Sequence, residues 1–323
     1  MIKPPGRFTF IDLKPSSGSF LDAVVAGLSA PRKTLPAKFF YDERGSKLFE
    51  EITNLPEYYQ TRTEMALLAD IAPALKKLIP RGSKLIEFGS GSTEKVRILI
   101  DKVEQFNTYV PIDISRDYLK MEAKDLASDH PNLKIIAICA DYTKPFPMPD
   151  GISGGSDCTG FFPGGTIGNM LPTEAAGFLR LAGSLLGRGA GFIIGVDLKK
   201  DPAILHAAYN DAKGVTAAFN MNVLLRINAE LGGDFDLANF RHRALYNALE
   251  SRIEMHLVSL ADQVVSVGGT SFNFLKGETI HTENSYKYNV GEFQALAKSA
   301  GMEPVNAWWD DDWLFSVHFL QVS

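Results

Sequence analysis

Residues 84–95 read KLIEFGSGSTEK, an apolar run that leads into two glycines. Leu85, Ile86 and Phe88 predict a short buried strand, and apolar residues at helical spacing begin at Val96. The glycines therefore join a strand to a helix. A turn of this kind lets a ligand lie against bare backbone, where the first amides of the helix point towards it. The stretch predicts a nucleotide-like ligand.

The residue at the start of the helix indicates which nucleotide fits. The dinucleotide fingerprint needs a third glycine three residues after the second, and this chain has Glu94 there. A carboxylate at that place repels a pyrophosphate but tolerates a ligand without phosphates. S-adenosylmethionine (SAM) is such a ligand: its positive charges suit Glu87, and its carboxylate suits Lys95. Taken alone, the turn is also compatible with a plain strand-to-helix connection.

The next strand ends in an acidic residue. Residues 109–113 read YVPID, and Asp113 follows Gly91 by 22 positions. This is about the offset at which an acidic side chain accepts hydrogen bonds from the ribose hydroxyls of a nucleotide. The alternative is that Asp113 only caps a helix that begins near Ser115.

A third strand ends in a similar way. Residues 133–142 read LKIIAICADY, so that an acidic residue, Asp141, stands beside an aromatic one, Tyr142. Asp141 is suited to accept a hydrogen bond from an adenine amino group while Tyr142 packs on the ring. The alternative makes Tyr142 an aromatic residue at the rim of the fold. Three successive strand ends, each with a part of one ligand, favour a SAM site.

The composition is that of an ordinary globular chain. Of 323 residues, 45% are hydrophobic and 22% are charged, and the net charge of -5 argues against nucleic-acid binding, which needs a basic surface. Two cysteines, and six histidines without metal-ligand spacing, suggest neither a disulfide scaffold nor a metal site. Residues 1–6 lack an apolar signal core, and no stretch is long enough to cross a bilayer. We expect a cytoplasmic monomer with a small-molecule partner and no membrane partner.

The order of elements predicts an α/β fold. Helices and strands alternate from about Thr63 to Asp197, which indicates a parallel sheet. The fourth strand region, residues 159–170, is rich in glycine and contains Asn169, whose amide can donate and accept. The last two strands are separated only by residues 310–312, so they must pair antiparallel. A mostly parallel sheet with an antiparallel last strand resembles that of the Rossmann-like class I SAM-dependent methyltransferases.

Two segments depart from this alternation. Residues 1–61 are dense in aromatic and turn residues and do not look like the start of a doubly wound sheet. Residues 201–287 begin with helical patterns and continue with extended runs at 253–257 and 264–267. The second segment predicts an insertion with its own sheet, which makes a smaller α+β part of the molecule.

Seven short motifs stand in a definite order along the chain. They are YDxxGS at 41–46, LPEYY at 55–59, ExGSGxxEK at 87–95, GTIGN at 165–169, GVTAAFN at 214–220, RIEM at 252–255 and TExSxK at 282–287. Over about residues 38–320, the chain resembles the histidine-specific SAM-dependent methyltransferases. The resemblance implies a methyltransferase core at 62–200 and 288–323, with a substrate-binding domain at 1–61 and 201–287. The implied reaction is Nα-methylation of L-histidine, up to the trimethylated product hercynine, in ergothioneine biosynthesis.

The resemblance also implies roles for individual residues. SAM would be held by residues at the three strand ends and the first helix: Gly89, Lys95, Asp113, Asp141 and Tyr142. The substrate would be held through its backbone by Tyr58, Asn169 and Tyr209, and through its imidazole by Glu283 and Ser285. Met255 would line the same pocket. Tyr41 would lie near the amine, and either Tyr41 or Tyr58 would pass on its proton.

Other functions remain open at this stage. Asn284 departs from the family pattern beside the implied imidazole contacts, so an Nα-methyltransferase for another aromatic amino acid is the main alternative. A nicotinamide-dependent oxidoreductase on a similar fold is a second, which Glu94 opposes. A third is a non-catalytic sensor of an amino acid or adenosine.

Overall fold

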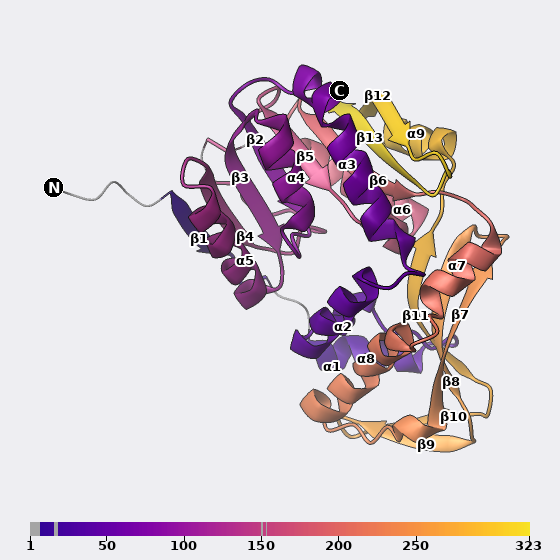
Figure 1. Cartoon of the computed structure of the whole chain (residues 1–323). Coiled ribbons are helices and arrows are strands. Elements are labelled where there is room, and N and C mark those ends of the chain that lie inside the picture. The colour runs from indigo at the N-terminus through magenta and orange to yellow at the C-terminus, as the bar shows by residue number, and fades with distance from the viewer. Residues whose placement is uncertain (1–6, 16–18, 150, 153) are drawn as a thin grey trace. The chain divides into compact units, whose positions relative to one another are not determined.

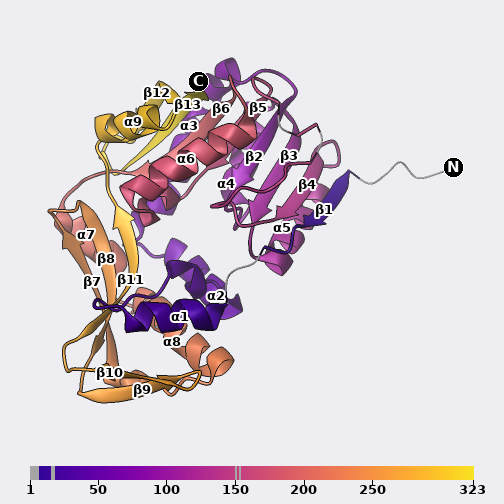
Figure 2. The same cartoon turned by 180° about the vertical axis from the view of Figure 1, so that it is seen from behind.

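The chain divides into two compact units. The structure, a computed structural model, describes residues 7–15, 19–149, 151–152 and 154–323. The first unit contains residues 7–15, Arg62–Leu198 and Tyr288–Ser323, and the second contains residues 19–61 and Lys199–Lys287. Figures 1 and 2 show the elements of both units from opposite sides.

An eight-stranded sheet forms the centre of the first unit, in the order β1-β4-β3-β2-β5-β6-β13-β12. The strands β1 to β6 pair in parallel, whereas β13 is antiparallel to both β6 and β12. The predicted mostly parallel sheet with an antiparallel last strand is therefore confirmed. The strands are β1 (Phe8–Asp12), β2 (Ser83–Phe88), β3 (Phe106–Asp113), β4 (Lys134–Cys139), β5 (Cys158–Phe162), β6 (Gly191–Asp197), β12 (Met302–Trp309) and β13 (Phe315–Val322).

Helices cover both faces of this sheet. One face carries α3 (Tyr59–Leu78), α4 (Glu94–Val103) and α5 (Arg116–Asp129) (Figure 1). The other carries α6 (Pro172–Leu186) and α9 (Val290–Ser299) (Figure 2). Parallel strands covered on both faces are apolar throughout, which explains why β2 could be recognised as a continuous buried run.

The N-terminal segment corrects one prediction. Residues 1–61 were all expected in the substrate-binding domain, but β1 pairs in parallel with β4 as an edge strand of the large sheet. The reason lies in two alternate residues, Phe8 and Phe10, which pack against the core of the first unit. The strand has only five residues, so its alternation of apolar and polar side chains is too short to be recognised beside the aromatic segment that follows.

The second unit has its own sheet, as predicted. The strands β7 (Phe240–Asn247), β8 (Arg252–Ser259) and β11 (Thr279–Tyr286) pair antiparallel in the order β11-β8-β7, and β9 (Gln263–Val267) pairs with β10 (Thr270–Phe274). The helical elements are α1 (Phe20–Ser29), η1 (Ala37–Phe40), α2 (Glu43–Thr53), α7 (Pro202–Tyr209), α8 (Val215–Leu231) and η3 (Leu237–Asn239). Of the helices that the structure describes, none is both long and apolar enough for a membrane span.

Candidate active site

The carboxyl ends of three neighbouring strands are tied together by backbone hydrogen bonds. The amide of Gly89, just after β2, donates to the carbonyl of Ile112 in β3 at 2.8 Å. The amide of Ala140, just after β4, donates to the carbonyl of Asp113 at 3.0 Å. The structure therefore brings the three predicted strand ends to one edge of the sheet.

The two glycines of the turn differ in their surroundings. Gly89 has a φ of +73°, and a Cβ there would lie 3.2 Å from the hydroxyl oxygen of Tyr142. Tyr142 thus covers the turn, and it packs edge-on against Phe162 and Phe178 with ring centroids 5.9 Å away. A Cβ on Gly91 would meet no described atom within 4 Å, so the second glycine has open space beside it.

Glu87 has a different role from the one expected. Its side chain is buried and accepts a hydrogen bond from the hydroxyl of Tyr109, which also lies 3.0 Å from the Ser90 hydroxyl. Burial raises the pKa of Glu87 to about 7, although the hydrogen bonds act in the other direction. The carboxyl group ties β2 to β3 and is not presented to a cationic ligand.

Asp113 stabilises the turn that leads into α5, in line with the alternative given above. Its Oδ1 accepts a hydrogen bond from the amide of Ser115 at 2.6 Å, directly before α5 begins at Arg116. Burial raises the pKa of the carboxyl group above its usual value. The cap occupies Oδ1 and fixes the side chain at the carboxyl end of β3. Its contact with a ribose stays a prediction.

Asp141 is held by its own turn. Its Oδ1 accepts from the amide and the hydroxyl of Thr143 at 3.1 and 2.5 Å, and Lys144 pairs with Oδ2 at 3.2 Å. Burial raises its pKa, but these partners outweigh burial and hold the pKa below the usual value. Asp141 is therefore a fixed carboxylate beside Tyr142, and its contact with an adenine stays a prediction.

Lys95 lies in the first turn of α4 and is held by a residue that the sequence analysis missed. Its Nζ lies 2.6 Å from Oε2 of Glu64, a fully buried residue of α3. Glu64 also accepts from the amide of Gly164 at 2.8 Å, and a Cβ on Gly195 would clash with its Oε1 at 2.0 Å. One carboxylate thus links α3, α4 and the loop after β5.

Asn169 ends the short helix η2 (Thr166–Asn169) after β5 and is exposed. It belongs to the first unit, whereas the other two residues predicted to hold the substrate backbone, Tyr58 and Tyr209, belong to the second. Their joint role stays a prediction.

Four polar side chains of the second unit form a buried network around Tyr209. The Tyr209 hydroxyl donates to Oγ of Ser285 at 2.8 Å. It accepts from Nε2 of Gln60 at 3.0 Å and from Nζ of Lys287 at 3.2 Å, and Lys287 also donates to Ser285 Oγ at 2.6 Å. The Tyr58 hydroxyl lies 3.4 Å from Oε1 of Gln60. The structure thus brings together three of the predicted substrate residues.

Glu283 and Ser285 share one face of β11, because alternate residues of a strand point to the same side. Glu283 stands opposite Met255 of β8, which is buried. Burial raises the pKa of Glu283 to about 7, and the nearby charge of Lys287 acts against that rise. Lys287 follows Ser285 at the same spacing of two. The sequence analysis gave no role to Lys287, but its spacing from Ser285 was a signal that its side chain lies on the same face.

Tyr41 lies in an aromatic cluster. It is 37% exposed and packs edge-on against Phe49 and Phe219, with centroids 5.7 and 5.5 Å away. Phe49 in turn contacts Tyr58 at 6.4 Å. The two candidate proton acceptors are thus joined through Phe49, and Tyr41 is the one in contact with solvent.

A family model described as "Histidine-specific methyltransferase, SAM-dependent" matches residues 20–322. The chain belongs to this family. Its cofactor is therefore SAM, and the edge formed by Gly89, Asp113 and Asp141, with Lys95 beside it, supplies polar groups of the kinds that SAM needs. Open space at Gly91 and the fixed carboxylates fit a ligand without phosphates.

The relatives agree with the family match. Histidine N-alpha-methyltransferase of Mycolicibacterium smegmatis is 39% identical over 89% of this chain and 90% of its own length. The protein of the same name from Mycobacterium tuberculosis is 38% identical over 90% of both chains. "Ergothioneine biosynthesis protein 1" of Neurospora crassa is 31% identical over 86% of this chain and 32% of its own length.

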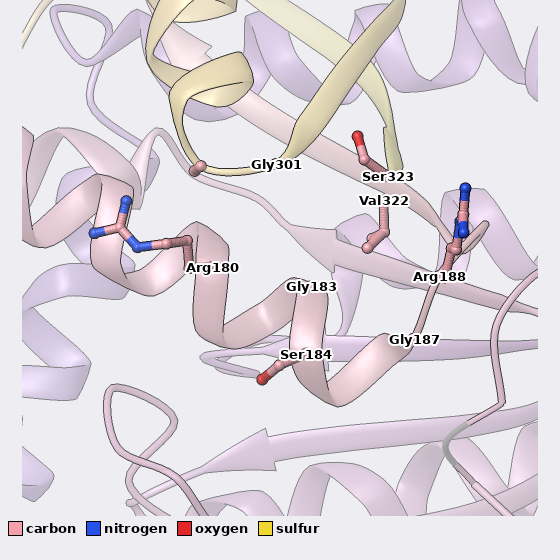
Figure 3. Close-up of a pocket in the computed structure, with 9 residues that line it drawn as sticks. Arg180, Gly183, Ser184, Gly187, Arg188, Gly301, Val322 and Ser323 are labelled. Atoms are coloured by element: carbon pink, nitrogen blue, oxygen red, sulfur yellow. The ribbon is translucent and has the colours of Figure 1, made fainter.

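Two other features involve residues without a predicted role. A shallow depression of about 380 Å³ is lined by Arg180, Gly187 and Ser323, among others (Figure 3). It lies at the amino ends of the parallel strands, opposite the SAM residues. In the second unit, His256 and His281 stack with centroids 4.7 Å apart beside Glu254. Stacked rings cannot both direct in-plane lone pairs at one ion, so we interpret this group as a polar network.

Proposed function

We propose that the protein transfers methyl groups from SAM to the α-amine of L-histidine, up to the trimethylated product hercynine, as a step of ergothioneine biosynthesis. The observation that carries the proposal is the pair Glu283 and Ser285 on one face of β11, in a chain of the histidine-specific family. An imidazole offers two ring nitrogens, and the two side chains offer one polar group to each.

The SAM site in this proposal uses the residues of the first unit. Asp113 accepts from the ribose hydroxyls, Asp141 accepts from the adenine amino group, and Tyr142 packs on the base. Gly89 lets the ligand approach the backbone. Lys95, held by Glu64 at 2.6 Å, faces the carboxylate of the methionine part.

The substrate in this proposal is held at its backbone and at its ring. Tyr58 and Asn169 hold the amino-acid backbone by hydrogen bonds. Tyr209 packs beside that backbone through its ring, because its hydroxyl is already engaged by Gln60, Lys287 and Ser285. Glu283 and Ser285 hold the imidazole. Met255, buried opposite Glu283, sets the volume of the pocket.

In methyl transfer the protein mainly positions the two reactants and removes water from around them. SAM, when bound, supplies an electrophilic methyl group on its sulfonium. The amine of histidine must be neutral to attack, so one proton leaves it for each methyl group gained. Tyr41, which is partly exposed, or Tyr58, which is buried, accepts that proton or passes it to water. Aromatic faces near Tyr41 and Phe49 suit the growing ammonium through cation–π attraction.

A competition experiment tests the proposal. The purified protein is incubated with SAM and an equimolar mixture of histidine, tryptophan, tyrosine and phenylalanine, and mass spectrometry counts the methyl groups on each. We expect histidine to gain three and the others almost none. Methylation of a different aromatic amino acid would support the alternative substrate. If none of the four amino acids were methylated, the proposed activity would be contradicted. A cytoplasmic location, a monomeric state and the lack of nucleic-acid and membrane partners stay predictions.

A further inference from the structure

The hydrogen-bond directions around Tyr209 are fixed by chemistry. The amide nitrogen of Gln60 and the ammonium of Lys287 have only hydrogens to offer, and both contact the Tyr209 oxygen, at 3.0 and 3.2 Å. The amide of Gln60 is oriented by its Oε1, which lies 3.4 Å from the hydroxyl of Tyr58. With its oxygen accepting twice, Tyr209 must donate its own hydrogen, and Ser285 Oγ lies 2.8 Å away.

The same reasoning decides the role of Ser285. Its oxygen accepts from Tyr209 and, at 2.6 Å, from Lys287. A serine hydroxyl has two acceptor positions and one hydrogen, so both acceptor positions are used. Within the described part of the chain, no acceptor is found for the remaining hydrogen. Ser285 is thus a buried hydroxyl that can only donate to a ligand.

Glu283 supplies a hydrogen-bond acceptor beside this donor. Its carboxylate accepts no hydrogen bond from any described side chain or amide, although it lies partly buried two residues before Ser285 on the same face. A free acceptor and a free donor thus stand side by side. They complement a ring that has one N–H group and one bare nitrogen.

We propose that Lys287 is a positioning residue that holds Ser285 as a hydrogen-bond donor, so that the pocket binds neutral imidazole in a single tautomer. The ring then donates its N–H to Glu283 and accepts from Ser285 at its other nitrogen. This inference rests on the proposed function, because it takes histidine as the substrate. Lys287 acts through Ser285 and makes no contact with the ring.

The tautomer can be observed directly. Histidine labelled with ¹⁵N in the ring is bound to the full-length protein together with S-adenosylhomocysteine, which permits no turnover. Nitrogen chemical shifts distinguish a protonated ring nitrogen from a bare one. We expect one nitrogen of each kind in the wild-type complex, without averaging between them.

Variants of Lys287 distinguish a role in orienting Ser285 from a role in packing alone. Lys287→Met frees one of the two acceptor positions of Ser285, so that its hydroxyl can accept from the ring as well as donate to it. The two nitrogen signals should then move towards each other, and histidine affinity should fall about tenfold, the loss expected for one hydrogen bond. Lys287→Arg, which keeps a donor, should restore the separated signals in part. The exposed Lys276 provides a matched control: Lys276→Met should change neither signal nor affinity.

The outcomes are distinct. A wild-type complex in which both ring nitrogens carry a proton would overturn the donor role of Ser285 while leaving histidine as the substrate. Unchanged signals in a Lys287→Met protein that still binds SAM would overturn the role of Lys287. If Lys287→Met does not fold, Tyr209→Phe, which removes the second donor to Ser285, should give the same averaging, and unchanged signals there would count equally against the proposal. Failure of the wild type to bind histidine would instead overturn the proposed function.

Discussion

Glu64 and Lys95 form an ion pair in which Oε2 and Nζ are 2.6 Å apart and the glutamate is fully buried. Breaking a completely buried pair costs about 3–5 kcal/mol, because the remaining charge loses its partner. Lys95 keeps some contact with solvent, so a smaller cost applies here. Glu64→Gln should lower the free energy of unfolding by roughly 2 kcal/mol. It should also weaken SAM binding, because Lys95 is no longer held in place.

A double-mutant cycle tests this coupling. Glu64→Gln, Lys95→Met and the combined variant are compared by urea unfolding, and their SAM affinities by calorimetry. Because the two side chains contact each other, the combined loss of stability should be smaller than the sum of the single losses. Strictly additive effects would show that the pair does not work as a unit.

Asp113→Ala should weaken SAM binding at least tenfold. The carboxylate is expected to accept from two ribose hydroxyls, and charge-assisted hydrogen bonds contribute roughly 1.5–3 kcal/mol each. Asp113→Asn is the matched control, since its amide oxygen can still cap Ser115. Calorimetry on folded proteins measures both. An alanine variant with wild-type affinity would leave Asp113 as a helix cap only.

Asn169→Ala and Tyr209→Phe should raise the KM for histidine while the affinity for SAM stays near that of the wild type. Asn169 is proposed to bind the amino-acid backbone, and Tyr209→Phe removes a hydrogen bond that Ser285 accepts in the substrate site. Neither residue lies at the ends of β2 to β4. Steady-state kinetics gives the KM, and calorimetry gives the cofactor affinity. The arrangement of two sites would be wrong if either change abolished SAM binding and spared histidine.

Stability should depend on pH through Glu87. Burial raises its pKa from 4.5 to about 7, so the folded protein binds this proton more tightly than the unfolded chain does. Below pH 4.5 such a carboxyl group does not lower the free energy of unfolding. Between pH 4.5 and about 7 it lowers that free energy increasingly, and above this window the reduction is complete. The loss over this window is on the order of 3 kcal/mol.

Glu87→Gln isolates this effect, because an amide can still accept from Tyr109 but does not titrate. Urea unfolding at pH 5 and at pH 8 gives the change in free energy for each protein. The wild type should lose more stability between these values than the variant does. Equal losses would mean that Glu87 does not titrate in this range.

The sequence was most informative where the candidate site is built from residues that are close together in the chain. The turn at Gly89 and Gly91 and the acidic residues at the ends of β3 and β4 are local patterns, whereas Glu283 and Ser285 were singled out only through the family resemblance. The antiparallel last strand followed from the short connection before β13, because a parallel pair needs a long crossover.

Residues whose partners are distant in the chain were harder to find. Gln60 and Tyr209 are 149 positions apart, and nothing in the helical pattern around Gln60 predicts their contact. Glu64 did leave a signal. It stands at helical spacing from Leu68, Ile71 and Leu75, which are all buried, and a carboxylate within an apolar stripe indicates a buried partner.

Glu283 is expected to decide which amino acid the enzyme prefers. A pocket built from polar groups rejects a substrate that leaves them buried and unpaired. The penalty is about 1–3 kcal/mol for a neutral group and more for a carboxylate, so the wild type should prefer histidine to phenylalanine by more than about a hundredfold. Glu283→Ala removes the acceptor. It should reduce histidine turnover sharply and bring the preference over tryptophan and phenylalanine down by at least about tenfold.

The assay is best run near pH 8, where a carboxyl group with a pKa of about 7 is ionised. Two variants serve as controls. Glu283→Gln keeps an acceptor of nearly the same shape and should retain part of the preference. Met255→Leu, opposite Glu283, keeps the side-chain volume and should change the turnover of all four amino acids to a similar, small extent. Competition among equimolar histidine, tryptophan, tyrosine and phenylalanine then gives each preference. An unaltered preference for histidine in Glu283→Ala would remove Glu283 from the imidazole site but leave the methyltransferase core intact, since every residue that is proposed to hold SAM belongs to the other unit.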